Sequence, residues 1–245
     1  MLTYGLYPVL EALRAARVRS LQVSARDDRR VREVLSQAAR LRIPVERVDH
    51  SVLDRLTRGA AHQGVVARCE EPGAWSVEDL VRHARGVPLL VVLDGIEDPR
   101  NLGALVRACD AAGVDGIVRQ SRHAAPLDGA AAKASAGSLA YARIAEVVNV
   151  ARVVEELKSL AVWTVGLSAE ATTSYTAVDY RQPTAFVLGA EGSGLRRLVR
   201  ERCDLVVSIP MQGHVASLNV AVAAGVVLFE AVRQRGASEG SPTRK

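Results

Sequence analysis

The sequence predicts an α/β protein of two domains, a small basic one followed by a larger one built on a parallel sheet. Residues 87–93 form an uninterrupted apolar run, and a strand that is apolar on both faces is typical of a parallel sheet covered by helices on both sides. Strand-like and helical segments then alternate toward the C-terminus, as in repeated β-α units. With 245 residues, 49% of them hydrophobic, the chain can bury a substantial core.

The first predicted domain covers residues 1–70, where short helical and strand patterns alternate. Apolar residues recur every three or four positions in three segments and cluster in three shorter ones. The expected helices cover 4–16, 28–41 and 51–56, and the expected strands cover 21–23, 44–48 and 64–68. Ser51 suits the N-cap of the third helix. Polar, helix-breaking residues follow, so we expect a linker over 71–85 that contains a helix at 76–84.

The second predicted domain covers residues 86–235. The expected strands cover 87–93, 116–118, 162–167, 185–188 and 205–209, and the expected helices cover 102–112, 150–160 and 218–235. The remaining residues, 236–245, are small and polar, which predicts a disordered tail.

The positive charge of the chain is concentrated at its N-terminal end. Residues 1–70 hold 13 arginines and eight acidic residues, a balance of +5, which equals the net charge of the whole chain. A basic module of this kind is typical of a domain that meets a polyanion such as RNA. The alternative is that arginine is simply the preferred surface base, since lysine is scarce throughout.

Several classes of protein are disfavoured by composition. Cys69, Cys109 and Cys203 are widely separated and lack metal-ligand spacing, so we expect three reduced cysteines and no metal. The longest apolar runs are too short to cross a bilayer, and no secretory signal opens the chain. A cytoplasmic protein without a membrane span is therefore expected.

Three strand-loop-helix segments carry the polar residues of a composite site, at 93–107, 186–195 and 209–219. The glycines of the second segment fit neither a dinucleotide fingerprint nor a phosphate loop, yet they allow a ligand to approach the backbone closely. Simple tight turns are the alternative. Asn101 and Ser217 also suit helix N-caps, and Arg107 could pair with an acidic side chain or face a phosphate.

These segments resemble the three motifs of the SpoU/TrmH family of RNA 2′-O-methyltransferases. The matching residues are Asn101-x-Gly103-x-x-x-Arg107, the loop Leu188 to Gly194, and Ile209-Pro210-Met211 with Ser217-Leu218-Asn219. Tyr4-Gly5-Leu6 and His62-Gln63-Gly64 resemble the subgroup that acts on a guanosine ribose in 23S rRNA. Arg100 departs from the pattern, because many relatives carry histidine there.

The resemblance implies a SPOUT fold, a parallel sheet with a deep C-terminal trefoil knot, preceded by a ribosomal-protein-like α/β domain. It implies a homodimer that binds S-adenosylmethionine, without a metal, and methylates 23S rRNA. The donor-binding residues would be Gly189, Gly194, Ile209, Met211 and Leu218, the catalytic residues Asn101, Arg107, Glu191, Ser217 and Asn219, and the RNA-binding residues Arg26, Arg29, Arg30, His62 and Arg100.

Other functions stay open at this point. The target could be tRNA or another 23S rRNA ribose, as in relatives that confer antibiotic resistance. A non-catalytic RNA-binding protein of ribosome assembly could keep the same fold. A nucleotide-dependent dehydrogenase is disfavoured, because the chain lacks the glycine fingerprint of that class and its acidic ribose ligand.

Overall fold

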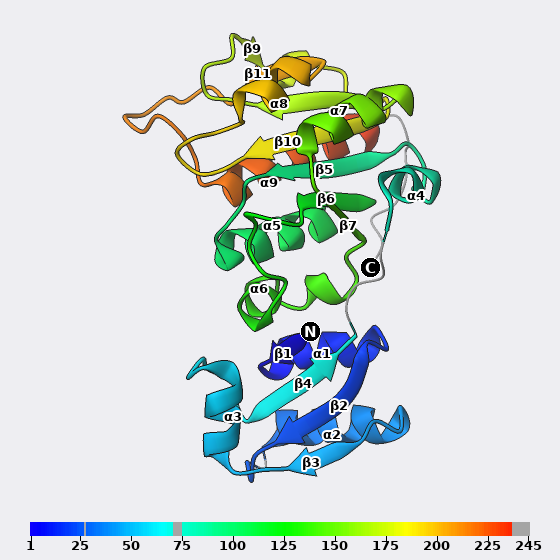
Figure 1. Cartoon of the computed structure of the whole chain (residues 1–245), viewed down its shortest axis with the longest axis vertical. Coiled ribbons are helices and arrows are strands. Elements are labelled where there is room, and N and C mark those ends of the chain that lie inside the picture. The colour runs from blue at the N-terminus through cyan, green and yellow to red at the C-terminus, as the bar shows by residue number, and fades with distance from the viewer. Residues whose placement is uncertain (27, 71–74, 237–245) are drawn as a thin grey trace. The chain divides into compact units, whose positions relative to one another are not determined.

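The computed structural model describes residues 1–26, 28–70 and 75–236 (Figure 1). The described residues of 1–72, 98–107 and 125–142 form one compact unit, the first unit. Those of 73–97, 108–124 and 143–236 form the second unit. Residues 71–74 of the expected linker and residues 237–245 of the expected tail lie outside the described residues. Gly236, which was expected to open the tail, ends the last helix.

A four-stranded mixed sheet organises the first unit, in the order β1-β4-β2-β3. β4 (Val65–Cys69) pairs antiparallel with β1 (Leu2–Tyr4) and β2 (Val18–Val23), and β3 (Val45–Arg47) pairs parallel with β2. The expected helix at 4–16 is α1 (Leu6–Arg14), because the chain before it is held in the sheet.

The two faces of this sheet bury separate clusters of side chains. Val65 and Ala67 of β4 lie in a core with α1 and α2 (Arg29–Arg40), whereas Val66 packs with Leu53 of α3 (His50–Thr57). This is the alternation expected of a strand covered on both sides. Ser51 lies inside α3, so the expectation that it caps this helix is wrong.

Besides β1, two further short elements of the first unit had no counterpart in the sequence patterns. They are α6 (Gly129–Ala134) and the 3-10 helix η1 (Ser138–Ala140). Their segment is rich in alanine and glycine and therefore lacks an amphipathic period. A Cβ on Gly129 would lie 1.8 Å from a ring carbon of Tyr4, so close packing against β1 requires glycine there.

The second unit contains a seven-stranded sheet in which every pair of neighbouring strands is parallel, which confirms the expected α/β class. The strand order is β7-β6-β5-β10-β8-β11-β9. The strands are β5 (Leu89–Asp94), β6 (Gly116–Gln120), β7 (Ile144–Val147), β8 (Trp163–Leu167), β9 (Thr173–Ser174), β10 (Thr184–Gly189) and β11 (Leu205–Ser208). The sequence patterns missed β7 and the two-residue β9.

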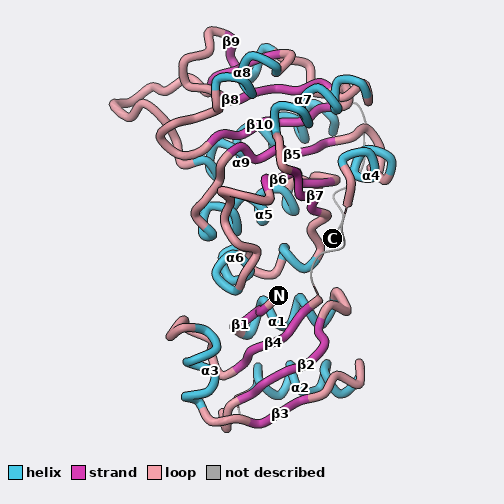
Figure 2. The backbone as a smooth tube through the Cα atoms, viewed as in Figure 1, coloured by secondary structure: helices cyan, strands magenta, loops and turns pink. Residues whose placement is uncertain are grey.

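Helices cover both faces of this sheet, as the continuous apolar strands required (Figure 2). α4 (Val77–Arg82), α7 (Val150–Ser159) and α8 (Arg197–Arg202) pack on one face, against a core that includes Leu90 and Val187. α9 (Val220–Gly236) covers the other face (Figure 1). No helix in the described part of the chain is long and apolar enough to span a bilayer.

Candidate functional site

A cavity of about 340 Å³ opens in the second unit at the carboxyl ends of β8, β10 and β11. Its walls include residues 167–170 from the end of β8 onward, residues 188–195 from the end of β10 onward, and residues 209, 211 and 216–218 after β11. In parallel α/β sheets, ligands bind at the carboxyl ends of the strands. The cavity therefore lies where the architecture predicts a small-molecule site.

Seven of the ten residues predicted to bind the donor or to act in catalysis line this cavity. They are Gly189, Glu191, Gly194, Ile209, Met211, Ser217 and Leu218. Asn219 follows directly and is the N-cap of α9, since its Oδ1 accepts a hydrogen bond of 3.0 Å from the Ala221 N–H. The alternative in which Ser217 caps this helix is therefore wrong.

The loop after β10 folds back on itself and exposes its backbone. Ala190 and Gly194 exchange two backbone hydrogen bonds of 3.1 and 2.9 Å, which closes a tight turn. Gly194 has a φ of 65°, in the left-handed region that favours glycine. A Cβ on Gly189 would lie 2.1 Å from the carbonyl carbon of Gly194, so no other residue fits there without moving the turn.

Asp94 anchors the far end of the same loop, and the sequence analysis did not identify it as a site residue. It is the last residue of β5, lies opposite Gly189 in the sheet, and is 1% exposed. Its carboxylate accepts from the Arg196 backbone N–H at 2.9 Å and from the Arg196 Nε at 2.7 Å. A carboxylate that directly follows a fully apolar strand was the available signal, because a charge placed there needs a partner.

Two further charged residues of the cavity were also missed. Arg200 of α8 donates to the Glu170 carboxylate at 2.8 Å, and both side chains line the cavity. Glu170 lies just beyond the predicted strand 162–167, at the end where ligand-binding residues of parallel sheets are found. Apart from these two, Glu191 is the charged residue of the lining.

The remaining predicted catalytic residues lie on α5 (Pro99–Ala111), in the part that belongs to the first unit. Arg107 is exposed and Asn101 is half-buried. Asp98 accepts a hydrogen bond of 2.7 Å from the Arg100 N–H, as a capping carboxylate does, so the helix begins three residues earlier than expected and Asn101 is not its cap.

The cysteines have no part in the site chemistry. All three are free, as expected, and burial raises the pKa of the Cys109 and Cys203 thiols to about 12. Thiolate nucleophiles require a lowered pKa, so neither residue supplies one.

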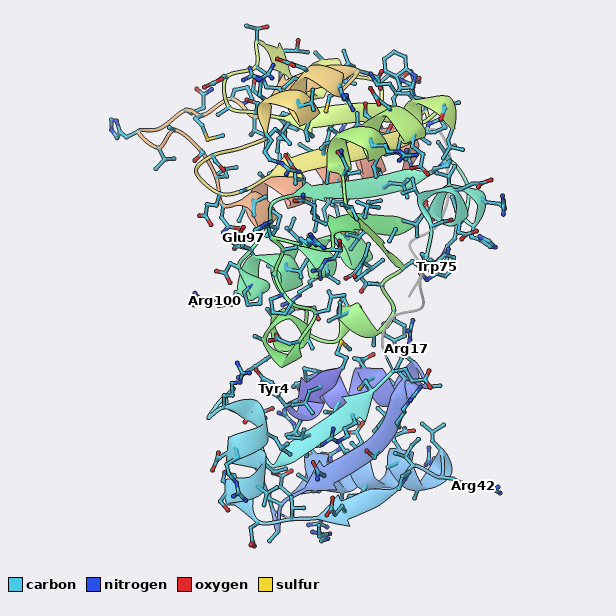
Figure 3. The ribbon with its side chains drawn as sticks, in the orientation of Figure 1. Tyr4, Arg17, Arg42, Trp75, Glu97 and Arg100 are labelled. Carbon is cyan, nitrogen blue, oxygen red and sulfur yellow. The ribbon has the colours of Figure 1, made fainter. Side chains whose placement is uncertain are left out.

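Four of the five predicted RNA-binding residues carry accessible cationic groups. Arg29 and Arg30 open α2 and are exposed. Arg26 donates to Asp28 at 2.5 Å, and Arg100 points into solvent with its Nε 3.6 Å from Asp98 (Figure 3).

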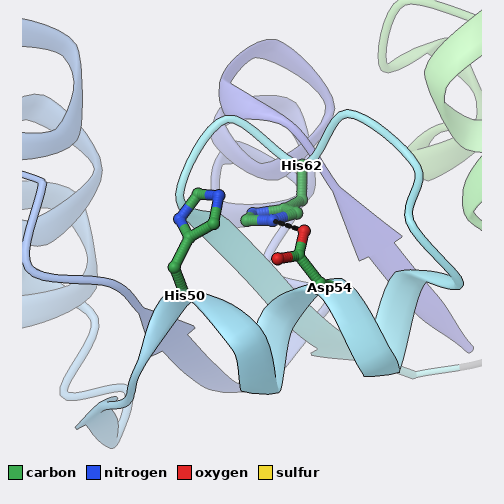
Figure 4. Close-up of side chains that lie close together, drawn as sticks. All are labelled: His50, Asp54 and His62. Carbon is green, nitrogen blue, oxygen red and sulfur yellow. Dashed lines mark hydrogen bonds and ion pairs between the residues drawn. The ribbon is translucent and has the colours of Figure 1, made fainter.

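The fifth, His62, is 2% exposed, which contradicts the expected RNA contact because a buried ring presents no edge to a polyanion. Its Nδ1 accepts a hydrogen bond of 3.1 Å from the Gly64 N–H. Its Nε2 therefore carries the proton and donates to Asp54 at 3.0 Å (Figure 4). The His50 ring lies 4.5 Å away, centroid to centroid.

His50, Asp54 and His62 bring their ligand atoms within 4.8 Å of one another, a spacing that a metal ion could bridge. A metal would need the lone pair of His62 Nε2, with the proton on Nδ1. The Gly64 N–H points at Nδ1 and requires it to be an acceptor. Metal-ligating histidines donate from their second nitrogen, so this donor set does not suit a metal. We interpret the cluster as a structural hydrogen-bond network.

Comparisons with known proteins match this architecture over nearly the whole chain. The model of the SpoU rRNA Methylase family matches residues 88–229, and that of the RNA 2′-O ribose methyltransferase substrate binding domain matches residues 2–75. The chain is 42% identical to a 23S rRNA (guanosine-2′-O-)-methyltransferase RlmB of Pseudomonas aeruginosa, over 95% of this chain and 96% of that one. It is 44% identical to an RlmB of a Burkholderia species, with 96% of each chain covered.

Solved structures agree with the sequence comparisons. The SpoU methyltransferase AviRb from Streptomyces viridochromogenes, in complex with the cofactor AdoMet, superposes with a TM-score of 0.82 at 30% identity, covering 97% of this chain and 91% of that one. An AdoMet-bound rRNA methyltransferase from Sinorhizobium meliloti superposes with a TM-score of 0.77 at 27% identity, covering 95% and 86%.

Proposed function

Because this chain belongs to the SpoU rRNA methylase family, we propose that it transfers the methyl group of S-adenosylmethionine to the 2′-hydroxyl of a guanosine ribose in 23S rRNA. The observation that carries this proposal is the cavity at the carboxyl ends of β8, β10 and β11, which is lined by both glycine-rich and apolar loop residues. Relatives named for this reaction match at 42–44% identity along almost their full length.

The cavity suits S-adenosylmethionine in size and in chemistry. Small-molecule sites enclose about 300 to 1,000 Å³, and this cavity has about 340 Å³. Its apolar side chains suit a purine ring, and the glycines at 189–194 let a ligand approach the backbone closely. Arg200 offsets one of the two carboxylates, so Glu170 and Glu191 leave the lining with a balance of one negative charge for a donor whose sulfonium and ammonium groups are positive. When bound, the donor supplies an electrophilic methyl group.

The residues of the chain must orient the ribose, relieve the developing charge on its oxygen and direct the proton away. We assign charge stabilisation and orientation of the substrate phosphate to Arg107, because a guanidinium offers only N–H donors and has no site to accept the proton. Following the family resemblance, Asn101 and Glu191 also belong to the catalytic set, and Ser217 and Asn219 position the ribose.

Arg107→Ala tests this assignment. We expect methyl transfer to fall about 10²- to 10³-fold, the cost of losing one preorganised donor, while affinity for S-adenosylmethionine stays unchanged. Arg107→Lys is the matched control and should retain part of the rate, because it keeps the charge but loses the planar fork. Equal losses of rate and of donor affinity in the alanine variant would contradict the assignment.

We propose that residues 1–70 bind RNA, with Arg26, Arg29 and Arg30 as phosphate contacts. Arg100 of α5 would make a further phosphate contact. We also propose that residues 86–235 form the methyltransferase domain, with the trefoil knot in its C-terminal part. All of the excess positive charge of the chain falls in residues 1–70. Action on ribosomal RNA in the cytoplasm, without a metal, completes the proposal.

We also propose a homodimer that uses the outer face of α9. Val222 and Phe229 lie seven residues, or two turns, apart on this helix, and both are exposed. An exposed apolar stripe on one helix face is typical of an interface. Sedimentation equilibrium of the full chain measures the oligomeric state directly.

The deciding experiment is transfer of labelled methyl groups from S-adenosylmethionine to unmodified 23S rRNA, followed by mapping of the modified nucleotide. A single methylated guanosine ribose supports the proposal. Labelling of tRNA, or of a different 23S rRNA ribose, would identify one of the alternative targets. Absence of donor binding in calorimetry would favour a non-catalytic RNA-binding protein.

A further inference from the structure

The outward face of α1 carries an exposed tyrosine in line with two charged residues. Tyr7, Glu11 and Arg14 occupy positions i, i+4 and i+7 and therefore share one face of the helix. The opposite face is buried, with residues such as Leu6 and Leu13 in the core of the first unit. Tyr7 is 54% exposed.

Neighbouring elements of the same unit complete this surface. The Arg30 guanidinium of α2 lies 5.1 Å from the centroid of the Tyr7 ring, within the range of a cation-π contact. The Tyr141 hydroxyl donates to Glu11 Oε2 at 2.9 Å, and Tyr141 is 47% exposed. Arg14 donates to Glu11 Oε1 at 2.5 Å. We refer to Tyr7, Glu11, Arg14, Arg30 and Tyr141 together as the tyrosine platform.

The platform presents aromatic rings beside cations. Glu11 places its charge between two donors, so its carboxylate is engaged and helps to hold Arg14 and the Tyr141 ring in place. Tyr7 and Tyr141 both expose their rings beside Glu11, so two aromatic faces are available to a partner on this surface. Arginines at their edge identify a partner that combines flat apolar faces with negative charge.

We propose that the tyrosine platform stacks unpaired bases of the RNA substrate, with Arg30 contacting an adjoining phosphate. This inference rests on the proposed function, because it specifies the single-stranded part of the same substrate. Bases that have left a helix stack on tyrosine rings and on guanidinium planes, whereas paired bases have no free face to offer. The balance of +5 in residues 1–70 favours RNA over a protein partner.

The test measures binding of the full chain to a single-stranded oligoribonucleotide of mixed sequence and to a fully paired duplex of the same length. We expect Tyr7→Ala to weaken binding to the single strand about 5- to 150-fold and to leave duplex binding unchanged. Tyr7→Phe should behave as the unsubstituted protein, because stacking needs only the ring. Trp163→Ala, which removes an exposed ring of the second unit, is the matched control and should change neither affinity.

Salt dependence separates stacking from charge. Tyr7→Ala should keep the slope of affinity against salt concentration, whereas Arg30→Ala should lower that slope by about one counterion. Thermal unfolding and calorimetric titration with S-adenosylmethionine check that each variant is folded, and both should be unchanged in Tyr7→Ala.

Three results would overturn this proposal. The first is an unaltered single-strand affinity in Tyr7→Ala, and the second is an equal loss of affinity for the single strand and the duplex. The third is a change from dimer to monomer in sedimentation of Tyr7→Ala, which would mean that the rings pack against a second copy of the chain. Failure of the proposed function is distinguishable. If the single strand binds through Tyr7 but no methyl group is transferred, the proposed methyltransferase activity is disproved and the platform is not. A protein that methylates 23S rRNA normally after Tyr7→Ala, with unaltered affinity, disproves the platform alone.

Discussion

Replacing Arg196 by alanine removes the guanidinium that faces the Asp94 carboxylate and leaves that carboxylate with the Arg196 backbone N–H. The Asp94 side chain is fully buried, whereas the Arg196 side chain is 56% exposed. The two partners are therefore not equivalent, since only one of them depends on the other for its solvation. Loss of the arginine leaves a buried charge, and loss of the aspartate leaves a cation that water can reach.

The magnitude follows from this asymmetry. A hydrogen bond to a charged group contributes about 1.5–3 kcal/mol, and breaking a fully buried ion pair costs about 3–5 kcal/mol. Because half of Arg196 already faces water, we expect Arg196→Ala to lower the free energy of unfolding by about 2–3 kcal/mol. Asp94→Asn should cost less, about 1 kcal/mol, since asparagine still accepts from the backbone N–H and removes the buried charge.

Urea denaturation of the two variants measures the loss of stability, and calorimetric titration with S-adenosylmethionine measures the effect on the cavity. Arg196 ends the segment that begins at Gly189, so donor affinity should fall in the same order as stability. Arg197→Ala is the control, because Arg197 pairs with Glu201 on the exposed side of α8, and its loss should cost about 0–1 kcal/mol. Equal effects of Arg196→Ala and Arg197→Ala would refute the reasoning.

Three further predictions follow from single contacts. Gly189→Ala should weaken donor binding at least about tenfold in calorimetry, since a Cβ would overlap the backbone of the turn, whereas Gly213→Ala, with open space around it, should not. His62→Ala should lower the free energy of unfolding in urea by about 2–3 kcal/mol, because a buried ring and two hydrogen bonds are lost; a loss below about 0.5 kcal/mol would contradict the structural role. Partial burial opposes ionisation of Asp204, but hydrogen bonds from Thr164 and the neighbouring Lys158 ammonium outweigh it and lower the pKa of Asp204 below its ordinary value. The stability that Asp204 contributes should therefore be present above the ordinary pKa of an aspartate and lost as the pH falls through the lowered pKa. Asp204→Asn should remove this acid-dependent loss in urea titrations, and an unchanged pH profile would contradict it.

Local patterns predicted most elements of the fold because the period of apolar residues is a property of neighbouring positions. The strand at 87–93 and the helix at 150–160 lie within a few residues of β5 and α7. Elements without such a period were missed. α6 is too small and too rich in alanine, and β9 contains only two residues, so each exists through the contacts that other segments provide.

Helix ends were predicted less well, because several residues could serve as the cap. Ser51, Asn101 and Ser217 all have suitable side chains, yet the helices begin elsewhere. Asp98 and Asn219 supply the capping oxygens of α5 and α9. Residue type alone therefore left the choice among neighbouring caps open.

The sequence by itself determined the class of the fold, the location of the excess charge and the loops that carry the motifs, since these depend on residue type and short-range spacing. Only the tertiary structure decided which loop residues share a cavity, because that depends on strand order. β10 pairs with both β5 and β8, which brings Asp94 opposite Gly189 although 95 positions separate them in the chain. In the first unit, packing beside Asp54 of α3 encloses His62, whose neighbours in the sequence gave no sign that its ring would be buried.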